Sequence, residues 1–145
     1  FEQIRKNILQ RERDPATLAR EVLGMREKLH AAHPNRSGLF DLKHDRGGMI
    51  DIEFTVQYLV LAHAHQHPQL TGNLGNIALL RIAAALGLID QDLAERCRNA
   101  YRDFRRLQHA LRLNSARYAR VPPAQVAAQA GAVHALWQAV FSAYR

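Results

Sequence analysis

The chain has 145 residues, of which 48% are hydrophobic, and a formal net charge of +7. This length fits one modest domain, or a small domain with part of a neighbour, and the apolar content suffices for a packed core rather than a disordered tail. No apolar run approaches the roughly 20 residues that a membrane-spanning helix needs, so no membrane is expected as a partner. A single cysteine, Cys97, excludes an internal disulfide framework and favours a reducing compartment, which predicts a cytoplasmic protein.

The first residues of the chain indicate what kind of protein it belongs to, and its net charge narrows its partners. The sequence begins at Phe1, with no initiator methionine and no apolar signal region, so we expect a piece of a longer protein. The positive charge suits nucleic acid, a nucleotide or an acidic protein partner. Because the 13 acidic residues are interspersed among the 20 basic ones, nucleic acid is disfavoured and the charge alone identifies no partner.

The apolar spacing predicts an all-α fold, beginning with a helix over residues 15 to 32. Asp14 is its predicted N-cap and Pro15 its first residue. The expected apolar stripe of this helix consists of Leu18, Val22, Met25 and Leu29. Its expected solvent face consists of Glu21, Arg26, Glu27 and Lys28.

Further helices are expected over residues 49–65, 77–86, 91–111 and about 124–144. Gly87 is the predicted C-cap of the third helix, and Asp90 is the predicted N-cap of the fourth. The fourth helix has the clearest apolar stripe, made of Leu93, Cys97, Ala100, Phe104, Leu107 and Leu111. A short extended segment is expected near residues 39–43. Together these elements predict a helical bundle of about five helices with antiparallel neighbours.

The densest group of special residues surrounds a glycine pair that precedes the second helix. Gly47 and Gly48 allow the backbone to approach a ligand closely or to adopt positive φ. The helix start behind them offers free N–H groups and a partial positive charge suited to phosphate, to which Lys43 adds a point charge. These residues are compatible with a phosphate-binding turn before a helix.

Two carboxylates follow the glycine pair. Asp51 is placed either to cap the helix or to orient a basic group, and Glu53 follows it by two residues. A plain turn explains the same residues, with Asp51 as the cap and Glu53 solvated, because short motifs of this kind often arise by chance. The candidate cofactor-binding residues are Lys43, Gly47, Gly48, Asp51 and Glu53.

Three other groups of residues have simpler explanations. His63, His65 and His67 alternate near a helix end, but they lack the glutamate of an H-E-x-x-H zinc site, so a solvated helix end is preferred. Cys97 occupies a stripe position and is expected in the core rather than as a nucleophile. The arginines on the polar face of the fourth helix suit either an acidic partner or plain solvation; they are Arg102, Arg105, Arg106 and Arg112.

The segment FDLKHDRGGMIDIEF and its continuation VQYLVLAHAHQHPQL resemble the signature of bacterial glutamine synthetase adenylyltransferase, which follows each of that enzyme's nucleotidyltransferase domains. The resemblance continues in REVLGMREKL before the signature, and in GNIALLRIAAALGLID and HALWQAVF after it. The Asp-Ile-Glu-Phe form, with Asp51, and the chain's end soon after Trp137 resemble the second, adenylylating half. The uridylyltransferase acting on the PII signal protein is a more distant relative, whose glycine pair is followed by a different sequence.

The resemblance implies an enzyme that uses Mg²⁺ to transfer AMP from ATP to a tyrosine of glutamine synthetase, with glutamine synthetase and PII as partners. Residues 1–45 would be the C-terminal tail of the nucleotidyltransferase domain, and residues 46–145 a C-terminal helical bundle domain. The family's metal-holding Asp-x-Asp pair precedes the matched region, so no catalytic or metal-binding residue is assigned here. Asp90 and Asp92 have that spacing, but helix capping explains them better. The fragment alone is expected to be inactive and to bind no cofactor tightly.

Two other interpretations stay open. The chain is alternatively a standalone basic helical module that binds nucleic acid or an acidic protein, or a purely structural spacer. An Asp-x-Asp strand upstream of the chain would favour the enzyme. A spacer predicts that the glycine pair tolerates substitution.

Overall fold

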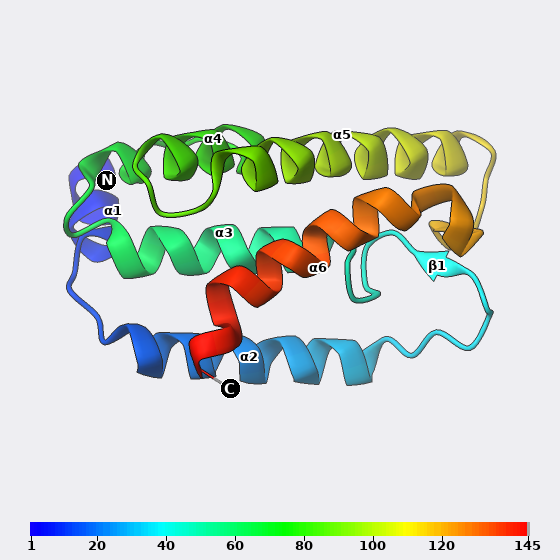
Figure 1. Ribbon diagram of the computed structural model, residues 1–145, viewed down its shortest axis with the longest axis horizontal. Coiled ribbons are helices and arrows are strands. Elements are labelled where there is room, and N and C mark those ends of the chain that lie inside the picture. The colour runs from blue at the N-terminus through cyan, green and yellow to red at the C-terminus, as the bar shows by residue number, and fades with distance from the viewer. Residues whose placement is uncertain (145) are drawn as a thin grey trace.

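The computed structural model describes residues 1–144 and contains six α-helices with one two-stranded sheet (Figure 1). The helices are α1 (Glu2–Leu9), α2 (Pro15–Ala32), α3 (Met49–His63), α4 (Asn76–Ala85), α5 (Gln91–Leu113) and α6 (Ala127–Phe141). The strands are β1 (Phe40–Asp41) and β2 (Arg120–Val121). Three short 3-10 turns cover Pro68–Thr71, Pro123–Val126 and Ser142–Tyr144. The all-α prediction is confirmed.

Helix α3 lies in the middle of the bundle. Figure 1 shows α2 along one side of it, α4 and α5 along the other, and α6 crossing the layers obliquely. One buried cluster joins α3, α4, α5 and α6, and a second joins α2, α3, α4 and α6. Because α3 contributes to both clusters, it is apolar nearly all round rather than on one stripe.

Local capping sets the helix limits where the sequence predicts them. The Asp14 carboxylate accepts a hydrogen bond from the Thr17 amide at 3.1 Å, and Asp90 accepts one from the Leu93 amide at 2.9 Å. Gly87 adopts a φ of +78° just beyond α4, as a C-terminal cap does. Cys97 is fully buried in the α5 stripe, which confirms its expected place in the core.

The prediction for one turn of α2 is wrong. Met25, expected in the apolar stripe, is 57% exposed, and Arg26, expected in solvent, is completely buried. The Arg26 guanidinium forms an ion pair with Asp51 and donates a hydrogen bond from Nη2 to the His44 carbonyl at 2.9 Å. The helix is therefore rotated so that a charged side chain meets its partner, while the flexible Met25 side chain lies outside.

The extended segment near residue 40 finds its partner within the chain. Strand β1 pairs antiparallel with β2, with Phe40 opposite Val121 and Asp41 opposite Arg120. Leu42 follows β1 into the core at 0% exposure. Residues before 45 thus share a core with those after it, and the assignment of residues 1–45 to a preceding domain stays a prediction.

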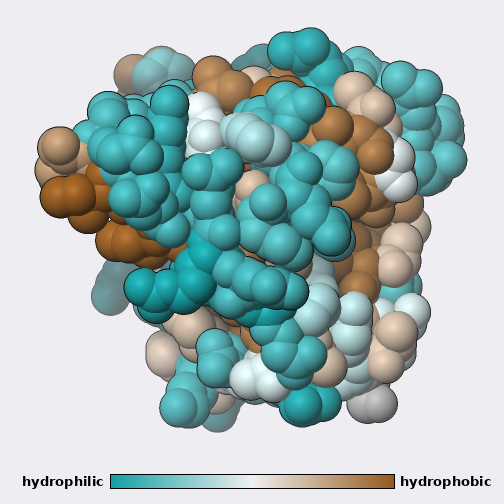
Figure 2. Space-filling model, turned by 90° about the vertical axis from the view of Figure 1, so that its left-hand side faces the viewer, coloured by the Kyte–Doolittle hydropathy of each residue, from teal (hydrophilic) through white to brown (hydrophobic). Residues whose placement is uncertain are grey.

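The sequence pattern did not predict α1, which has no buried residue. The Ile4 and Ile8 side chains of α1 are exposed, as are Phe1 just before it and Leu74 in the loop before α4. Figure 2 shows this end of the molecule, where brown apolar surface borders a mainly hydrophilic face. Among the helices that the structure describes, none is long and apolar enough to cross a membrane.

Candidate functional site

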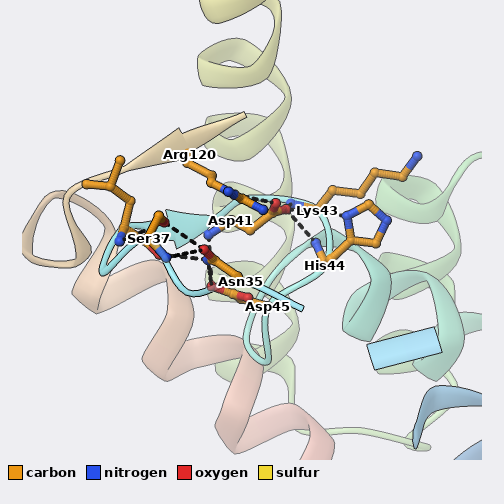
Figure 3. Close-up of polar contacts among 8 residues, drawn as sticks. Asn35, Ser37, Asp41, Lys43, His44, Asp45 and Arg120 are labelled. Atoms are coloured by element: carbon orange, nitrogen blue, oxygen red, sulfur yellow. Dashed lines mark hydrogen bonds and ion pairs between the residues drawn. The ribbon is translucent and has the colours of Figure 1, made fainter. Parts of the chain in front are cut away.

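The loop between β1 and α3 is held in shape by two aspartates (Figure 3). The Asp41 carboxylate accepts hydrogen bonds from the amides of Lys43 (3.0 Å) and His44 (2.9 Å), and from Arg120 Nε (3.2 Å). The Asp45 carboxylate accepts from the Asp41 amide at 2.9 Å and from Asn35 Nδ2 at 2.8 Å. Carboxylates spanning successive amides in this way fix a turn, so the loop is a preorganised element.

The electrostatics of the loop follow from these contacts. Burial opposes the ionisation of Asp41, but the hydrogen bonds from His44, Arg120 and Lys43 outweigh it and lower the pKa of the Asp41 carboxyl. Burial and the neighbouring His33 lower the pKa of His44, whose ring stacks on His33 with centroids 3.9 Å apart. Asp41 is therefore ionised and satisfied within the loop, and the His44 ring favours its neutral form.

The glycine pair is required by close packing. Gly47 has a φ of +90°, and a Cβ there would lie 2.9 Å from His134 Nε2 and 3.1 Å from Ala130 Cβ on α6. A Cβ on Gly48 would lie 2.7 Å from the Leu42 carbonyl oxygen. The two glycines therefore let the loop pass between α6 and its own backbone.

The amides at the start of α3 bind carbonyls of the same loop. The Met49 amide donates to the Leu42 carbonyl at 2.8 Å, and the Ile50 amide donates to the Lys43 carbonyl at 3.1 Å. The Gly48 amide donates to the Asp45 carbonyl at 2.9 Å. The backbone amides that were expected to bind phosphate therefore bind carbonyls of the loop instead. The Lys43 side chain is exposed and remains available to a ligand.

Asp51 takes one of the two roles that the sequence allowed: it orients a basic group, whereas the N-terminus of α3 at Gly48 has no side-chain cap hydrogen bond. One carboxylate oxygen pairs with Arg26, and the other accepts from the Gly47 amide at 2.7 Å. The side chains of Arg26 and Asp51 are only 1% and 4% exposed. A buried pair of this kind ties α2, the glycine loop and α3 together, and no sequence pattern indicated Arg26 as the partner.

Glu53 lies one turn along α3 and faces α5. It accepts a hydrogen bond from the Tyr101 hydroxyl at 2.8 Å, and Asn76 Nδ2 donates to the same hydroxyl at 3.2 Å. Burial and Glu53 together raise the pKa of Tyr101. Glu53 is therefore held by the bundle on a different side from Lys43.

A cavity of about 180 Å³ adjoins the outer side of the loop. Its lining consists of Asp41, Lys43 and His44 from the loop, Gln108, Leu111 and Arg112 from α5, and residues 116–119. Figure 3 shows Lys43 and His44 directed away from the Asn35 and Asp45 contacts. The cavity places Arg112 and Arg117 beside Lys43, a grouping that no sequence pattern indicated because about 70 residues separate them.

The other candidate residues from the sequence are the arginines of α5 and the residue types that bind metals. Arg102, Arg105 and Arg106 are exposed on α5, as expected, and help to line a second hollow of about 440 Å³. In the described part of the chain, no three His, Cys, Asp or Glu side chains are grouped as metal ligands.

The chain resembles known proteins over almost its whole length. The model of the family described as GlnD PII-uridylyltransferase matches residues 19–138. Relatives in Bordetella bronchiseptica, Aromatoleum aromaticum and Burkholderia pseudomallei are 59%, 57% and 56% identical, over 97%, 97% and 99% of this chain. Each relative is named bifunctional glutamine synthetase adenylyltransferase/adenylyl-removing enzyme, and the chain spans 15% of its length. The chain therefore belongs to the family described as GlnD PII-uridylyltransferase, in the form found in relatives named bifunctional glutamine synthetase adenylyltransferase/adenylyl-removing enzyme.

Proposed function

We propose that this chain is a helical module of an enzyme that transfers AMP from ATP to a tyrosine of glutamine synthetase. The support is the family membership, together with relatives above 50% identity that carry this activity in their name. ATP and Mg²⁺ are then the cofactors of the full-length enzyme, and the cytoplasm is its compartment.

The module follows the adenylylating nucleotidyltransferase domain, with residues 46–145 as its helical bundle and residues 1–45 as the tail of the catalytic domain. The Asp51 form of the signature supports this placement. The carboxylates that would hold two Mg²⁺ ions would belong to the preceding domain, and the metals would supply charge stabilisation for phosphoryl transfer there. The module by itself is inactive and binds ATP weakly.

The role of this module is to present a rigid loop to the catalytic domain. The observation that carries this proposal is the position of Lys43, exposed on a loop that Asp41, Asp45 and the Arg26–Asp51 pair hold in shape. Gly47, Gly48 and Asp51 act by positioning this loop, and Glu53 acts by fixing α3 against α5. Lys43 donates to a phosphate of ATP when the two domains close.

Substitution of Lys43 in the full-length enzyme tests this role. Lys43→Ala is expected to raise the KM for ATP in adenylylation roughly tenfold, because a charge-assisted hydrogen bond is lost. Lys28→Ala removes the same charge from the exposed face of α2 and serves as the matched control. Equal kinetics for Lys43→Ala and the wild type would refute a nucleotide role for this loop.

Calorimetry with ATP tests the placement of the module. A chain extended upstream through the catalytic domain is expected to bind ATP with Mg²⁺ much more tightly than the 145-residue chain does. Equal affinity for the two would show that the metal site is not upstream.

Glutamine synthetase and the PII protein are the proposed protein partners. The exposed arginines of α5 offer a basic surface to an acidic partner. Arg105→Glu with Arg106→Glu is expected to slow association with the true partner, measured by surface plasmon resonance against each protein. Unchanged association with both would place their binding elsewhere.

A further inference from the structure

The charge of this chain is distributed very unevenly. Residues 104–145 contain six arginines and no aspartate or glutamate. This stretch covers the second half of α5, the following loop, β2 and α6. Two arginines of this stretch, Arg112 and Arg117, line the cavity beside the candidate loop.

Three cations around the 180 Å³ cavity have no carboxylate partner among the described residues: Lys43, Arg112 and Arg117. The carboxylate in the lining, Asp41, is already bound by Arg120 and by two backbone amides. Like charges gathered around one hollow repel each other, so an anion that enters it lowers the free energy of the arrangement.

The C-terminal end of α5 also borders the cavity, and a helix C-terminus repels anions by roughly half an elementary charge. Its last carbonyls are capped, because the Asn114, Ser115 and Ala116 amides donate to the carbonyls of Ala110, Arg112 and Leu111. Three full positive charges outweigh this residual dipole, so the potential in the cavity favours an anion.

The size of the cavity limits the ligand. Its volume of about 180 Å³ is below the roughly 300–1,000 Å³ of sites that enclose a drug-sized molecule. It accommodates a short phosphate chain and leaves a nucleoside outside. Arginine and lysine match phosphate oxygens in charge and hydrogen bonding, and arginine does so with two parallel donors.

We propose that this cavity is an oligophosphate-binding subsite in which Lys43, Arg112 and Arg117 hold the phosphate chain of a nucleotide or free inorganic oligophosphate. This proposal rests on the proposed function only where it names the nucleotide as ATP; the binding of a phosphate chain is argued from the cavity itself. It adds two arginines from a distant segment to the loop that carries Lys43, so the phosphate chain bridges the loop and the end of α5.

Titration of the 145-residue chain with tripolyphosphate, followed by phosphorus NMR, tests the subsite. We expect saturable binding that Arg112→Gln with Arg117→Gln weakens about a hundredfold, at about tenfold for each of the two lost charged contacts. Arg20→Gln with Arg81→Gln removes the same charge from exposed positions outside the cavity and is expected to bind within about twofold of wild type. Unchanged thermal midpoints would show that all variants are folded.

Several outcomes would overturn the subsite. They are an absence of saturable tripolyphosphate binding by the wild type, an equal loss of affinity in the control variant, and binding of a glutamate-rich peptide in preference to tripolyphosphate. Competition by ATP distinguishes the sources: a nucleotide subsite is expected to bind ATP more tightly than tripolyphosphate, whereas a subsite for free oligophosphate is expected to bind tripolyphosphate at least as tightly as ATP. Adenylylation of glutamine synthetase by the full-length enzyme is measured in a separate assay. A lack of adenylylation would refute the proposed function but would not change the tripolyphosphate titration.

Discussion

The buried pair between Arg26 and Asp51 makes one substitution on α2 unusually destabilising. The Asp51 carboxylate is only 4% exposed in the native protein, and Arg26→Ala would leave it with the backbone amide of Gly47 as its remaining hydrogen-bond donor. Removing one partner of a buried ion pair costs about 3–5 kcal/mol, because the other charge stays desolvated. A domain has a total free energy of unfolding of about 5–15 kcal/mol, so this single change removes a large part of it.

Urea denaturation followed by circular dichroism measures this loss. With a dependence of about 2 kcal/mol per molar urea, a loss of about 4 kcal/mol lowers the midpoint by about 2 M. Arg20→Ala, on the exposed face of the same helix, is the matched control and is expected to change stability by no more than about 0.5 kcal/mol. Arg26→Met with Asp51→Asn removes both charges and is expected to recover part of the loss.

Two results would refute this reasoning. If Arg26→Ala lowered the midpoint no more than Arg20→Ala does, the pair would contribute little to stability. If the double variant lost as much as the sum of Arg26→Met and Asp51→Asn measured singly, the two side chains would not be coupled.

Three further predictions concern the loop and the core. Gly47→Ala is expected to lower the free energy of unfolding by about 2 kcal/mol, because a Cβ there is strained at φ +90° and lies 2.9 Å from His134 Nε2. Gly24→Ala, with open space around it in α2, is expected to raise the free energy of unfolding by about 0.5–1 kcal/mol. Thermal unfolding of both variants measures the difference. The pKa of Asp41 is lowered in the folded state, so the ionised carboxylate stabilises the fold above the unfolded pKa, and this stability is lost as the pH falls through the folded pKa. The urea midpoint of Asp41→Asn is therefore expected to fall less steeply below about pH 4 than that of the wild type. Burial raises the pKa of Cys97 to about 12, so a maleimide at pH 8 is expected to label it only after unfolding, and rapid labelling of the native protein would contradict its core position.

Local chemistry in the sequence predicts the helices and part of the site. The caps at Asp14, Asp90 and Gly87 act within a few residues, so their effect is visible in the sequence and agrees with the structure. The sequence also singled out Lys43 and the glycine pair, and it allowed Asp51 to orient a basic group.

The tertiary structure alone decided which residues complete the site. Periodicity placed Met25 inside and Arg26 outside, because apolar residues are normally buried and charges solvated. The structure reverses this pair, since Asp51, 25 residues away along the chain, offsets the desolvation of the guanidinium. In the same way, the packing of distant segments pairs β2 with β1 and brings Arg112 and Arg117 to the cavity that Lys43 lines. Helix periodicity reports which side of a helix is buried, but the partners that bury a charge or gather cations belong to other segments, and only the assembled fold brings them together.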